Sequence, residues 1–311
     1  MRRFAALDDE RTVVSNDFGD YAVLERREAA LLESGLPLAD AERNRDLEAK
    51  GLLVPRQLPT NLEAAVLRTR KAFLLEGPSL HIFVVTLRCD HSCQYCQVSR
   101  ASLTASGFDM SREDAAAAVD RVFECPSRTL TIEFQGGEPA LRFDLVREIV
   151  ALAHARNEIE QRSLQFSMVS TLHHLGPDEL AFCKEHSINL STSIDGPPEV
   201  HDAQRPNPTR DSWQRTVDAL ARAREVLGDN AVAALPTITR RALADPQGLV
   251  DQYRALGFPS IFLRPVSPYG FARKTRRALG YEMSEFVAFY ERALDYILDL
   301  NRQGTNPVRS C

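Results

Sequence analysis

From Leu80 onward, short apolar runs alternate with longer stretches whose apolar residues recur at helical spacing. The runs are rich in β-branched or aromatic residues and have the length of strands. They occupy 80–88, 128–135, 163–171, 188–195, 231–239 and 260–266. The predicted helices are 111–124, 142–157, 177–186, 210–227, 246–256 and 282–302. Ser111 and Asp114 have the spacing of a capping pair at the start of the first helix.

This alternation predicts an α/β fold in which parallel strands are joined by right-handed crossovers. Six such units form either a partly closed barrel or an open doubly wound sheet, and the periodicity does not distinguish the two. In both arrangements, ligands and reacting groups meet at the carboxyl ends of the strands. The loops that follow the strands are therefore the places to look for chemistry.

The first 75 residues follow a different pattern. "RTVVSNDFGDYAVL" predicts a β-hairpin at 11–24 with its turn at Asn16, Asp17 and Gly19. Helices are expected at 25–33 and 39–50, the second ended by Gly51, then an extended run at "GLLVP", a linking helix at 60–76 and a boundary at Gly77-Pro78. These elements predict a small winged-helix-like α+β domain at 1–75 and an α/β core at 76–311.

Composition narrows the class of protein. A chain of 311 residues with 44% hydrophobic residues can bury a full core, and its net charge of −5 offers no general attraction to nucleic acid or anionic membranes. The amino-terminal segment has no apolar stretch of the kind that a secretory signal needs, and no later run is long enough to span a membrane. We therefore expect a cytoplasmic protein without nucleic-acid or membrane partners.

The segment "CDHSCQYC" holds Cys89, Cys93 and Cys96 directly after the first predicted strand of the core. Six cysteines in a chain of this length are too few for a disulfide scaffold, and clustered thiols in a reducing compartment more often hold metal. Three thiolates can bind three irons of a four-iron cluster and leave the fourth iron open to a ligand. The alternatives are zinc with His91 as fourth ligand, and three buried cysteines without metal.

Two more polar segments follow later strands. "QGGEP" after the second strand offers Gly136 and Gly137 for a close backbone approach and Glu138 to pair with an ammonium group. "STSIDGPPEVHDAQRP" after the fourth strand carries Ser193, Asp195 and Arg205, although an ordinary turn and a surface ion pair would also explain it. Weaker candidates for the same face are Arg264, His173 and His174.

Taken together, these segments resemble the radical S-adenosylmethionine (radical SAM) superfamily, in which a partial (βα)6 barrel carries a 4Fe–4S cluster. The resemblance implies that Cys89, Cys93 and Cys96 hold the cluster and that Tyr95 lies near the adenine of S-adenosylmethionine. It also implies that the "QGGEP" segment receives the amino group of this cofactor. By the same resemblance, Ser193 and Asp195 contact the polar end or ribose of the cofactor, and Arg205 binds its carboxylate.

Within the superfamily, the chain resembles peptide-modifying enzymes related to sulfatase maturases, and most of all the B-type radical maturase of the His-Xaa-Ser system. The segments that carry this resemblance best are 89–100, 135–141 and 260–273. It implies an enzyme that reductively cleaves S-adenosylmethionine to a 5′-deoxyadenosyl radical and modifies side chains of a small peptide or protein. It also implies an electron donor of the reductase, flavodoxin or ferredoxin type, and possible work beside a companion maturase.

Two further expectations concern the three remaining cysteines and the first 75 residues. Cys125, Cys183 and Cys311 are one thiolate short of an auxiliary all-cysteine cluster, so none is expected within these residues, although relatives carry a cysteine-rich extension. Residues 1–75 contain 12 Lys and Arg against 13 Asp and Glu, which favours a precursor-binding unit or a structural cap over a DNA-binding one. The competing functions are a catalytically silent peptide-binding module and a zinc-stabilised protein.

Overall fold

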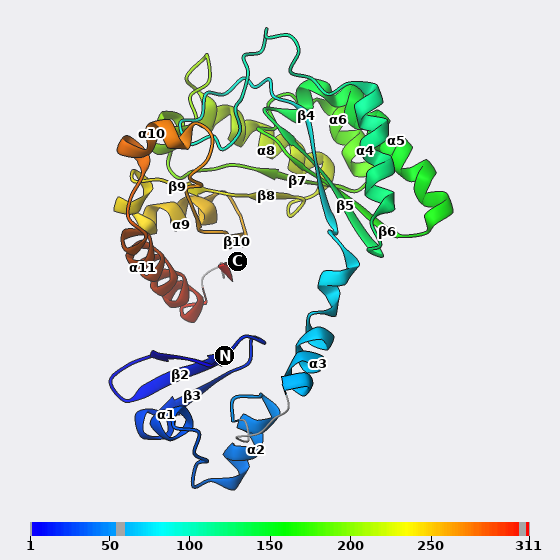
Figure 1. Cartoon of the computed structure of the whole chain (residues 1–311). Coiled ribbons are helices and arrows are strands. Elements are labelled where there is room, and N and C mark those ends of the chain that lie inside the picture. Colours follow the sequence, from blue (N-terminus) through cyan, green and yellow to red (C-terminus); the bar gives the residue numbers. More distant parts are fainter. Residues whose placement is uncertain (1, 54–59, 305–308, 311) are drawn as a thin grey trace. The chain divides into compact units, whose positions relative to one another are not determined.

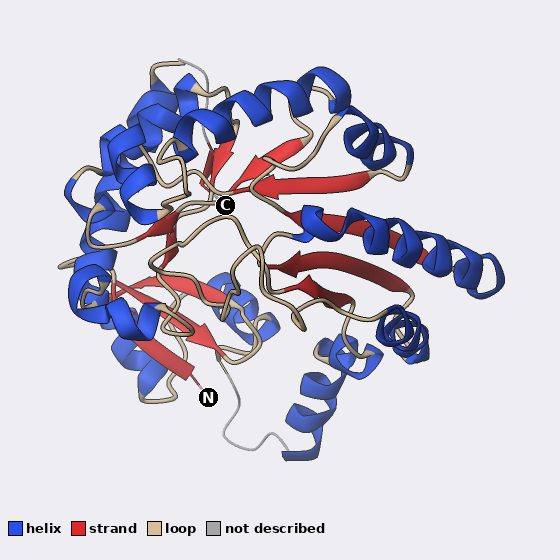
Figure 2. Cartoon of the chain, turned by 90° about the horizontal axis from the view of Figure 1, so that it is seen from above, coloured by secondary structure: helices blue, strands red, loops and turns tan. Residues whose placement is uncertain are grey.

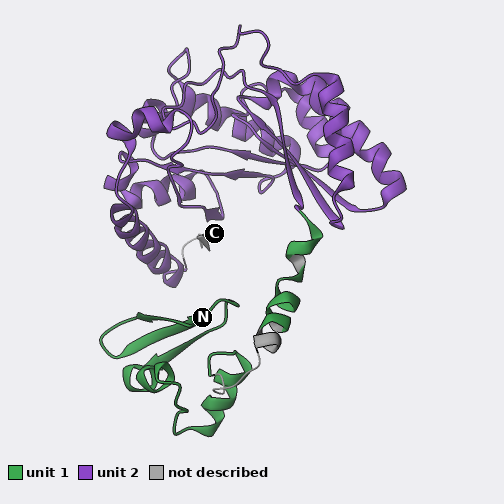
Figure 3. Cartoon of the chain, viewed as in Figure 1, with its two compact units in different colours: residues 1–77 green, residues 78–311 purple. Residues whose placement is uncertain are grey.

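The computed structural model describes residues 2–53, 60–304 and 309–310, and the chain divides into two compact units, residues 1–77 and 78–311 (Figure 3). The smaller unit contains a three-stranded antiparallel sheet in the order β1-β2-β3. Its elements are β1 (Arg2–Ala6), β2 (Arg11–Asn16), β3 (Tyr21–Glu25), α1 (Arg26–Glu33), α2 (Ala41–Ala49), α3 (Thr60–Arg70) and the 3-10 helix η1 (Ala72–Glu76).

The predicted hairpin is present as β2 and β3, and its turn has the expected chemistry. The Asn16 side-chain oxygen accepts hydrogen bonds from the backbone N–H groups of Phe18 (2.9 Å) and Asp20 (3.1 Å), and Gly19 supplies the positive φ of 89°. Strand β1 was not predicted, because a short, partly charged segment becomes a strand only through pairing with β2. Since β2 is now the central strand, β3 forms one edge of the sheet.

The end of this unit differs in part from the sequence prediction. Helix α2 is followed by Gly51 at a positive φ of 67°, as expected for a residue that ends a helix. Residues 51–53 form a turn and a bend in place of the expected extended run, and the remainder of "GLLVP" lies outside the described residues. Leu52 and Leu53 are buried in the small core of this unit.

The larger unit is built on a parallel sheet with the strand order β4-β5-β6-β7-β8. These strands are β4 (Leu80–Thr86), β5 (Thr129–Gly136), β6 (Ser163–Val169), β7 (Ile188–Thr192) and β8 (Val232–Ala234). A doubly wound sheet reverses its strand order at a switch point, whereas here each strand lies beside its predecessor. The partial barrel is therefore confirmed, with the strands in an arc and the helices along its outer side (Figure 2).

The larger unit contains the helices named next, and most of them cover the outer face of this arc (Figure 1). They are α4 (Arg112–Glu124), η2 (Pro139–Arg142), α5 (Phe143–Glu160), α6 (Pro177–Glu185), α7 (Pro198–Gln204), α8 (Ser212–Leu227), η3 (Ala242–Ala244), α9 (Pro246–Ala255), α10 (Ala272–Leu279) and α11 (Met283–Arg302). The strand residues that face the helices are buried apolar ones such as Phe134, Phe166 and Met168, and they form the main core. Ser111 caps α4 by accepting the N–H of Asp114 (3.0 Å), as predicted.

The last two predicted strands are each broken in two. Residues 231–239 contain β8 and β9 (Thr237–Ile238), because Pro236 between them has no N–H to donate to a sheet. Residues 260–266 contain β10 (Ser260–Ile261), which pairs with β12 (Arg309–Ser310), and β11 (Arg264–Pro265), which pairs with β9. The short helices α7 and α10 were not predicted. None of the described helices is long and apolar enough to cross a membrane.

Candidate functional site

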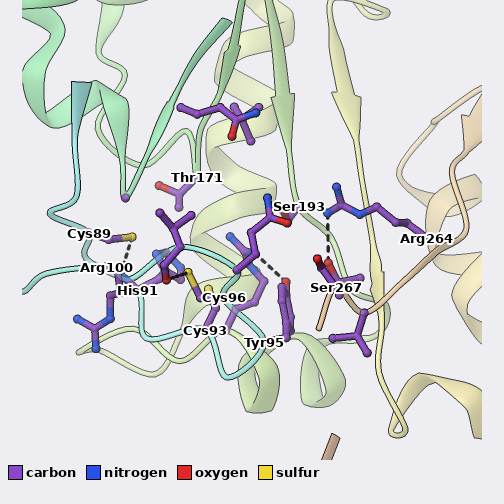
Figure 4. A pocket seen from close by; sticks show the side chains of 18 of the residues that line it. Cys89, His91, Cys93, Tyr95, Cys96, Arg100, Thr171, Ser193, Arg264 and Ser267 are labelled. Carbon is purple, nitrogen blue, oxygen red and sulfur yellow. Dashed lines mark hydrogen bonds between the residues drawn. The ribbon is translucent and has the colours of Figure 1, made fainter. Parts of the chain in front are cut away.

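A pocket of 470 Å³ opens where successive strands of the larger unit end. Cys89, Cys93 and Cys96 lie on its wall, in the loop that follows β4 (Figure 4). Groups from later strand ends complete the wall: Gly136 and Gly137, Ser170 and Thr171, Ser193, Thr237 and Arg264. The sequence prediction that these loops meet at one site is therefore correct for the pocket as a whole.

The cysteine loop is held by hydrogen bonds along its backbone. Ser92 N–H donates to the carbonyl of Pro206 (2.8 Å), and Gln94 N–H donates to the carbonyl of Gln204 (2.9 Å). Cys89 N–H donates to the carbonyl of Ala101 (3.1 Å). Two distant segments thus fix the loop before any ligand binds.

A third segment, at the start of α10, packs on the same loop. Phe271 N–H donates to the carbonyl of Cys96 (2.8 Å), and the Thr275 hydroxyl donates to the carbonyl of Gln94 (2.8 Å). Gly270 has a positive φ of 58°, and a Cβ there would lie 2.4 Å from the carbonyl oxygen of Gln97. The sequence "PYGFAR" therefore includes a glycine because the two backbones approach too closely for any side chain.

Burial favours the neutral form of the three thiols. Burial raises the pKa of Cys93 to about 11 and raises the pKa values of Cys89 and Cys96 as well. Cys96 Sγ donates to the carbonyl of Val98 (3.1 Å), and Cys89 Sγ accepts from the N–H of His91 (3.4 Å). Because metal binding replaces thiol protons, a cation or cluster here would be bound with release of protons.

A single zinc ion with His91 as fourth ligand does not fit this geometry. The ring nitrogens of His91 already contact the Asp90 carboxylate (2.8 Å) and the Ser212 hydroxyl (2.8 Å), and the residue is 1% exposed. Among the described residues, Cys89, Asp90 and His91 are the group whose ligand atoms lie within 4.8 Å of one another. The three cysteine sulfurs do not all lie within 4.8 Å of one another, as the ligands of one tetrahedral zinc ion would.

Asp90 connects the cysteine loop to the loop after β6. Its carboxylate contacts His91 as above and His174 Nε2 (3.1 Å), and His173 Nδ1 lies 3.5 Å away. Burial alone would raise the pKa of Asp90, but hydrogen bonds from these histidines bring it far below its ordinary value. His173 and His174, which were weaker candidates for the pocket face, do not line the pocket. Their contact with Asp90 joins residues 84 positions apart, which no local pattern indicates.

Gly136 and Gly137 line the pocket, but their first role is to pack against the strand before the cysteine loop. A Cβ on Gly136 would lie 2.0 Å from the carbonyl oxygen of Thr86, and one on Gly137 would lie 2.2 Å from that of Arg88. Gly137 N–H also donates to Thr86 O (2.8 Å). The two glycines therefore keep the ends of β4 and β5 in direct backbone contact.

Glu138 is fully buried and does not line the pocket. One carboxylate oxygen accepts from the Ala140 N–H (3.0 Å) and the Ser170 hydroxyl (2.7 Å), and the other accepts from the Thr171 N–H (2.7 Å). The expected partner, an ammonium group of a ligand, is replaced by three donors of the protein. Glu138 positions the loop after β6, since Ser170 and Thr171 are on the pocket wall.

We predict that Glu138→Gln lowers the free energy of unfolding of the metal-free protein by about 2 kcal/mol, because an amide NH₂ would face buried donors. Chemical denaturation without cofactor measures this. The matched control Glu291→Gln, at an exposed position in α11, should change it by less than about 0.5 kcal/mol. Equal stability of both variants would mean that Glu138 does not hold the loop.

Tyr95, Asp195 and Arg205 form a buried, hydrogen-bonded group beside the pocket, and Tyr95 and Arg205 also line its wall. The Tyr95 hydroxyl donates to Asp195 Oδ2 (2.5 Å) and accepts from Arg205 Nη1 (2.8 Å), and the Thr237 N–H donates to Asp195 Oδ1 (2.9 Å). Burial raises the pKa values of Asp195 and Tyr95. Asp195 is fully buried, both of its oxygens accept hydrogen bonds, and it does not line the pocket, so in this structure it positions Tyr95.

Ser193 lines the pocket together with Tyr95 and Arg205. Arg205 Nε is buried without a hydrogen-bond partner among the described residues, so this donor is available to a ligand. Arg264, from β11, also reaches the wall, and its Nη2 lies 3.4 Å from the Thr237 hydroxyl. The guanidinium groups of Arg100, Arg205 and Arg264 therefore line the same pocket as the three thiols.

Residues 83–241, about half of the chain, match the family model of the radical SAM superfamily. The chain belongs to the radical SAM superfamily. Its members bind a 4Fe–4S cluster together with S-adenosylmethionine, which confirms the cofactors expected from the sequence. This radical SAM protein presents three separated thiols beside polar groups and free space, so its residues fit both ligands.

Solved structures agree on the fold. A structure described as "Native anSMEcpe with bound AdoMet" superposes with a TM-score of 0.60 at 17% identity, covering 74% of this chain and 63% of that chain. "Crystal structure of Streptococcus suis SuiB bound to precursor peptide SuiA" gives a TM-score of 0.57 at 13% identity, covering 100% of this chain and 73% of that chain.

Two curated sequence relatives are uncharacterized proteins. One, from Methanocaldococcus jannaschii, is 28% identical over 133 residues, which cover 43% of this chain and 44% of the relative. The other, from Methanothermobacter thermautotrophicus, is 30% identical over 131 residues, which cover 41% of this chain and 47% of the relative. The match thus spans less than half the length of each curated relative.

Proposed function

We propose that this protein is a radical SAM peptide maturase whose cluster is held by Cys89, Cys93 and Cys96. When bound, the cluster and S-adenosylmethionine would supply one-electron radical chemistry that modifies a peptide side chain. The observation that carries the proposal is that all three thiols share one pocket wall with polar groups from the ends of later strands.

The protein's own residues bind and orient S-adenosylmethionine in this proposal. Ser193 and Arg205 offer a hydroxyl and a guanidinium to its polar end, and Gly136 and Gly137 allow close approach of the backbone. Tyr95 stays in place through Asp195, and Glu138 fixes the wall formed by the loop after β6. Holding cofactor and target carbon in line is the protein's part of the catalysis.

We further propose that the substrate is a His-Xaa-Ser-type precursor, on the strength of the segments at 89–100, 135–141 and 260–273. A peptide bound to anSMEcpe and a precursor peptide bound to SuiB in solved structures support a peptide substrate class. The reaction would take place in the cytoplasm, where thiols stay reduced, and a companion maturase would act on the same precursor. The domain boundary proposed from the sequence, 1–75 and 76–311, separates a precursor-binding unit from the catalytic core.

Anaerobic reconstitution tests the function. The protein should take up iron and sulfide, turn brown, and form 5′-deoxyadenosine with dithionite and S-adenosylmethionine. A synthetic precursor peptide with His-Xaa-Ser repeats should then change mass. Colourless protein with bound zinc contradicts the proposal, and so does a brown protein that binds cofactor and peptide without cleaving the cofactor.

The β3 edge of the smaller unit supports the binding of a precursor strand. Asn16 N–H bonds to Asp20 O (3.1 Å) and Arg26 N–H bonds to Glu10 O (2.9 Å) across the hairpin. Because such bonds alternate along an antiparallel ladder, the backbone groups of Tyr21 and Val23 face away from β2. Their side chains are 64% and 41% exposed, so an added strand finds both free backbone groups and apolar contacts.

We predict that Val23→Pro weakens binding of the synthetic precursor peptide by about 10-fold or more, because the substitution removes one backbone donor at the edge and crowds an added strand. Fluorescence anisotropy of labelled peptide measures the dissociation constant. Ala6→Pro, at an exposed position in β1 on the other side of the sheet, is the matched control and should bind the peptide normally. Unchanged binding by Val23→Pro would exclude the β3 edge.

A further inference from the structure

Helix α10 and the neighbouring Arg240 carry a concentration of positive charge that the proposed function does not use. We call Arg240, Arg273, Lys274, Arg276 and Arg277 the α10 basic patch. They line a surface hollow of 660 Å³ that contains a single carboxylate, Glu282. The chain as a whole has a net charge of −5, so the positive charge of this patch is opposite in sign to the net charge of the chain.

These cations are exposed and mostly available to a partner. Within the described part of the chain, Arg240 pairs with Glu285 (3.2 Å), while Arg273, Arg276 and Arg277 have no ion pair. The buried side of α10 consists of Ala272 and Leu279, so the charged side chains point outward. Unpaired like charges on one helix repel one another and lower its stability. The stability of α10 therefore does not explain these cations.

The same helix touches the cysteine loop. As described above, Phe271 and Thr275 bond to the carbonyls of Cys96 and Gln94 (both 2.8 Å), and Gly270 lies against Gln97. The basic patch is thus presented by the element that packs directly on the segment holding two of the three thiols. A protein docked on this patch would lie beside the cysteine loop without entering the 470 Å³ pocket, since the two hollows share no lining residue.

We propose that the α10 basic patch is the docking surface for an acidic one-electron donor protein of the flavodoxin type. This inference rests on the proposed function, which requires one electron from outside for each cleavage of S-adenosylmethionine. One electron would pass from the reduced flavin of the donor to the cluster, so the flavin is oxidised by one electron and no bond forms or breaks in this step. Complementary charge orients such a donor and speeds its encounter.

A charged substrate peptide explains the patch less well. The peptide's target side chain has to enter the pocket that the thiols line, whereas the patch borders a separate hollow. An electron donor has no such requirement, because it needs only a short distance to the cysteine loop. The position of the patch therefore favours the donor over the substrate.

The triple variant Arg273→Glu/Arg276→Glu/Arg277→Glu tests the inference by binding alone. Calorimetry with oxidised flavodoxin should show a dissociation constant raised by at least about 10-fold, and the unchanged protein should lose affinity as salt rises from about 50 to 200 mM. The matched control Arg128→Glu/Lys184→Glu/Arg222→Glu makes the same change in net charge at exposed positions elsewhere and should bind normally. Equal weakening in both variants would overturn the proposal.

The rates of 5′-deoxyadenosine formation with flavodoxin and with dithionite distinguish a failure of this inference from a failure of the proposed function. In the α10 variant, 5′-deoxyadenosine formation driven by flavodoxin, its reductase and NADPH should fall by at least about 10-fold, while formation driven by dithionite stays unchanged. If dithionite gives no product even with the unchanged protein, the proposed function fails, and the binding measurement still decides on the docking surface. Normal flavodoxin binding combined with weaker binding of the synthetic precursor peptide would assign the patch to the substrate and overturn the proposal.

Discussion

Cys93→Ala is expected to form no 5′-deoxyadenosine above background, a fall of more than about 100-fold, because loss of a direct ligand exceeds the roughly 10–100-fold cost of losing an outer partner. Cys93 lines the pocket with Cys89 and Cys96, and each thiol would bind a different iron. Cys89→Ala and Cys96→Ala should behave alike. Iron and sulfide content after anaerobic reconstitution, together with product formation, measures the effect.

Cys125→Ala provides the matched control. Cys125 is buried at the end of α4, where its sulfur donates to the carbonyl of Pro78 (3.0 Å), and it does not line the pocket. This variant should keep its iron and most of its activity. If it lost iron as completely as Cys93→Ala, or if Cys93→Ala kept full activity, the assignment of the cluster ligands would be wrong.

The sequence predicted well what depends on local pattern. Helix periodicity placed α4, α5 and α11 within a few residues, and the spacing of the three cysteines after a strand indicated the chemistry of the site. The order of the strands did not follow from periodicity, because the same βα alternation suits a barrel and a doubly wound sheet. The resemblance to the radical SAM superfamily, whose members form a partial barrel, favoured the barrel over the doubly wound sheet.

The roles of individual polar residues depended on contacts between distant segments. Asp195 and Glu138 carry the chemistry of ligand-binding residues, but they meet Tyr95, 100 positions away, and Thr171, 33 positions away. No local pattern distinguishes a carboxylate on a pocket wall from one that fixes a loop just behind it. The structure brings residues of all these motif segments to one pocket, while the side chains that face the pocket were known only from the structure.

The glycines illustrate the same point. From the sequence, Gly136 and Gly137 suggested room for a ligand, whereas the structure shows that they make room for the backbone of the strand before the cysteine loop. Gly270, 133 positions later than Gly137 in the sequence, does the same on the other side of that loop, at Cys96 and Gln97. Close backbone packing around the cysteine loop thus fixes the positions of the three thiols.

Gly137→Ala should accordingly damage both stability and cluster binding. Its Cβ would lie 2.2 Å from the carbonyl oxygen of Arg88 and 2.6 Å from that of Leu87, so the backbone just before Cys89 would have to move. We expect the free energy of unfolding to fall by about 3 kcal/mol, the upper range for overpacking, and iron content after reconstitution to fall with it. Denaturation of the metal-free protein and iron analysis measure the two effects.

Gly107→Ala separates this steric effect from the backbone preference of glycine. Gly107 has a positive φ of 78°, but a Cβ there would meet nothing within 4 Å. Alanine at this position should cost about 1 kcal/mol through the left-handed conformation and leave iron binding intact. Gly137 has no positive φ, so a larger loss of unfolding free energy in Gly137→Ala than in Gly107→Ala can come only from the contact with Arg88 and Leu87. Equal losses in the two variants, or normal iron content in Gly137→Ala, would show that the cysteine loop does not depend on this backbone contact.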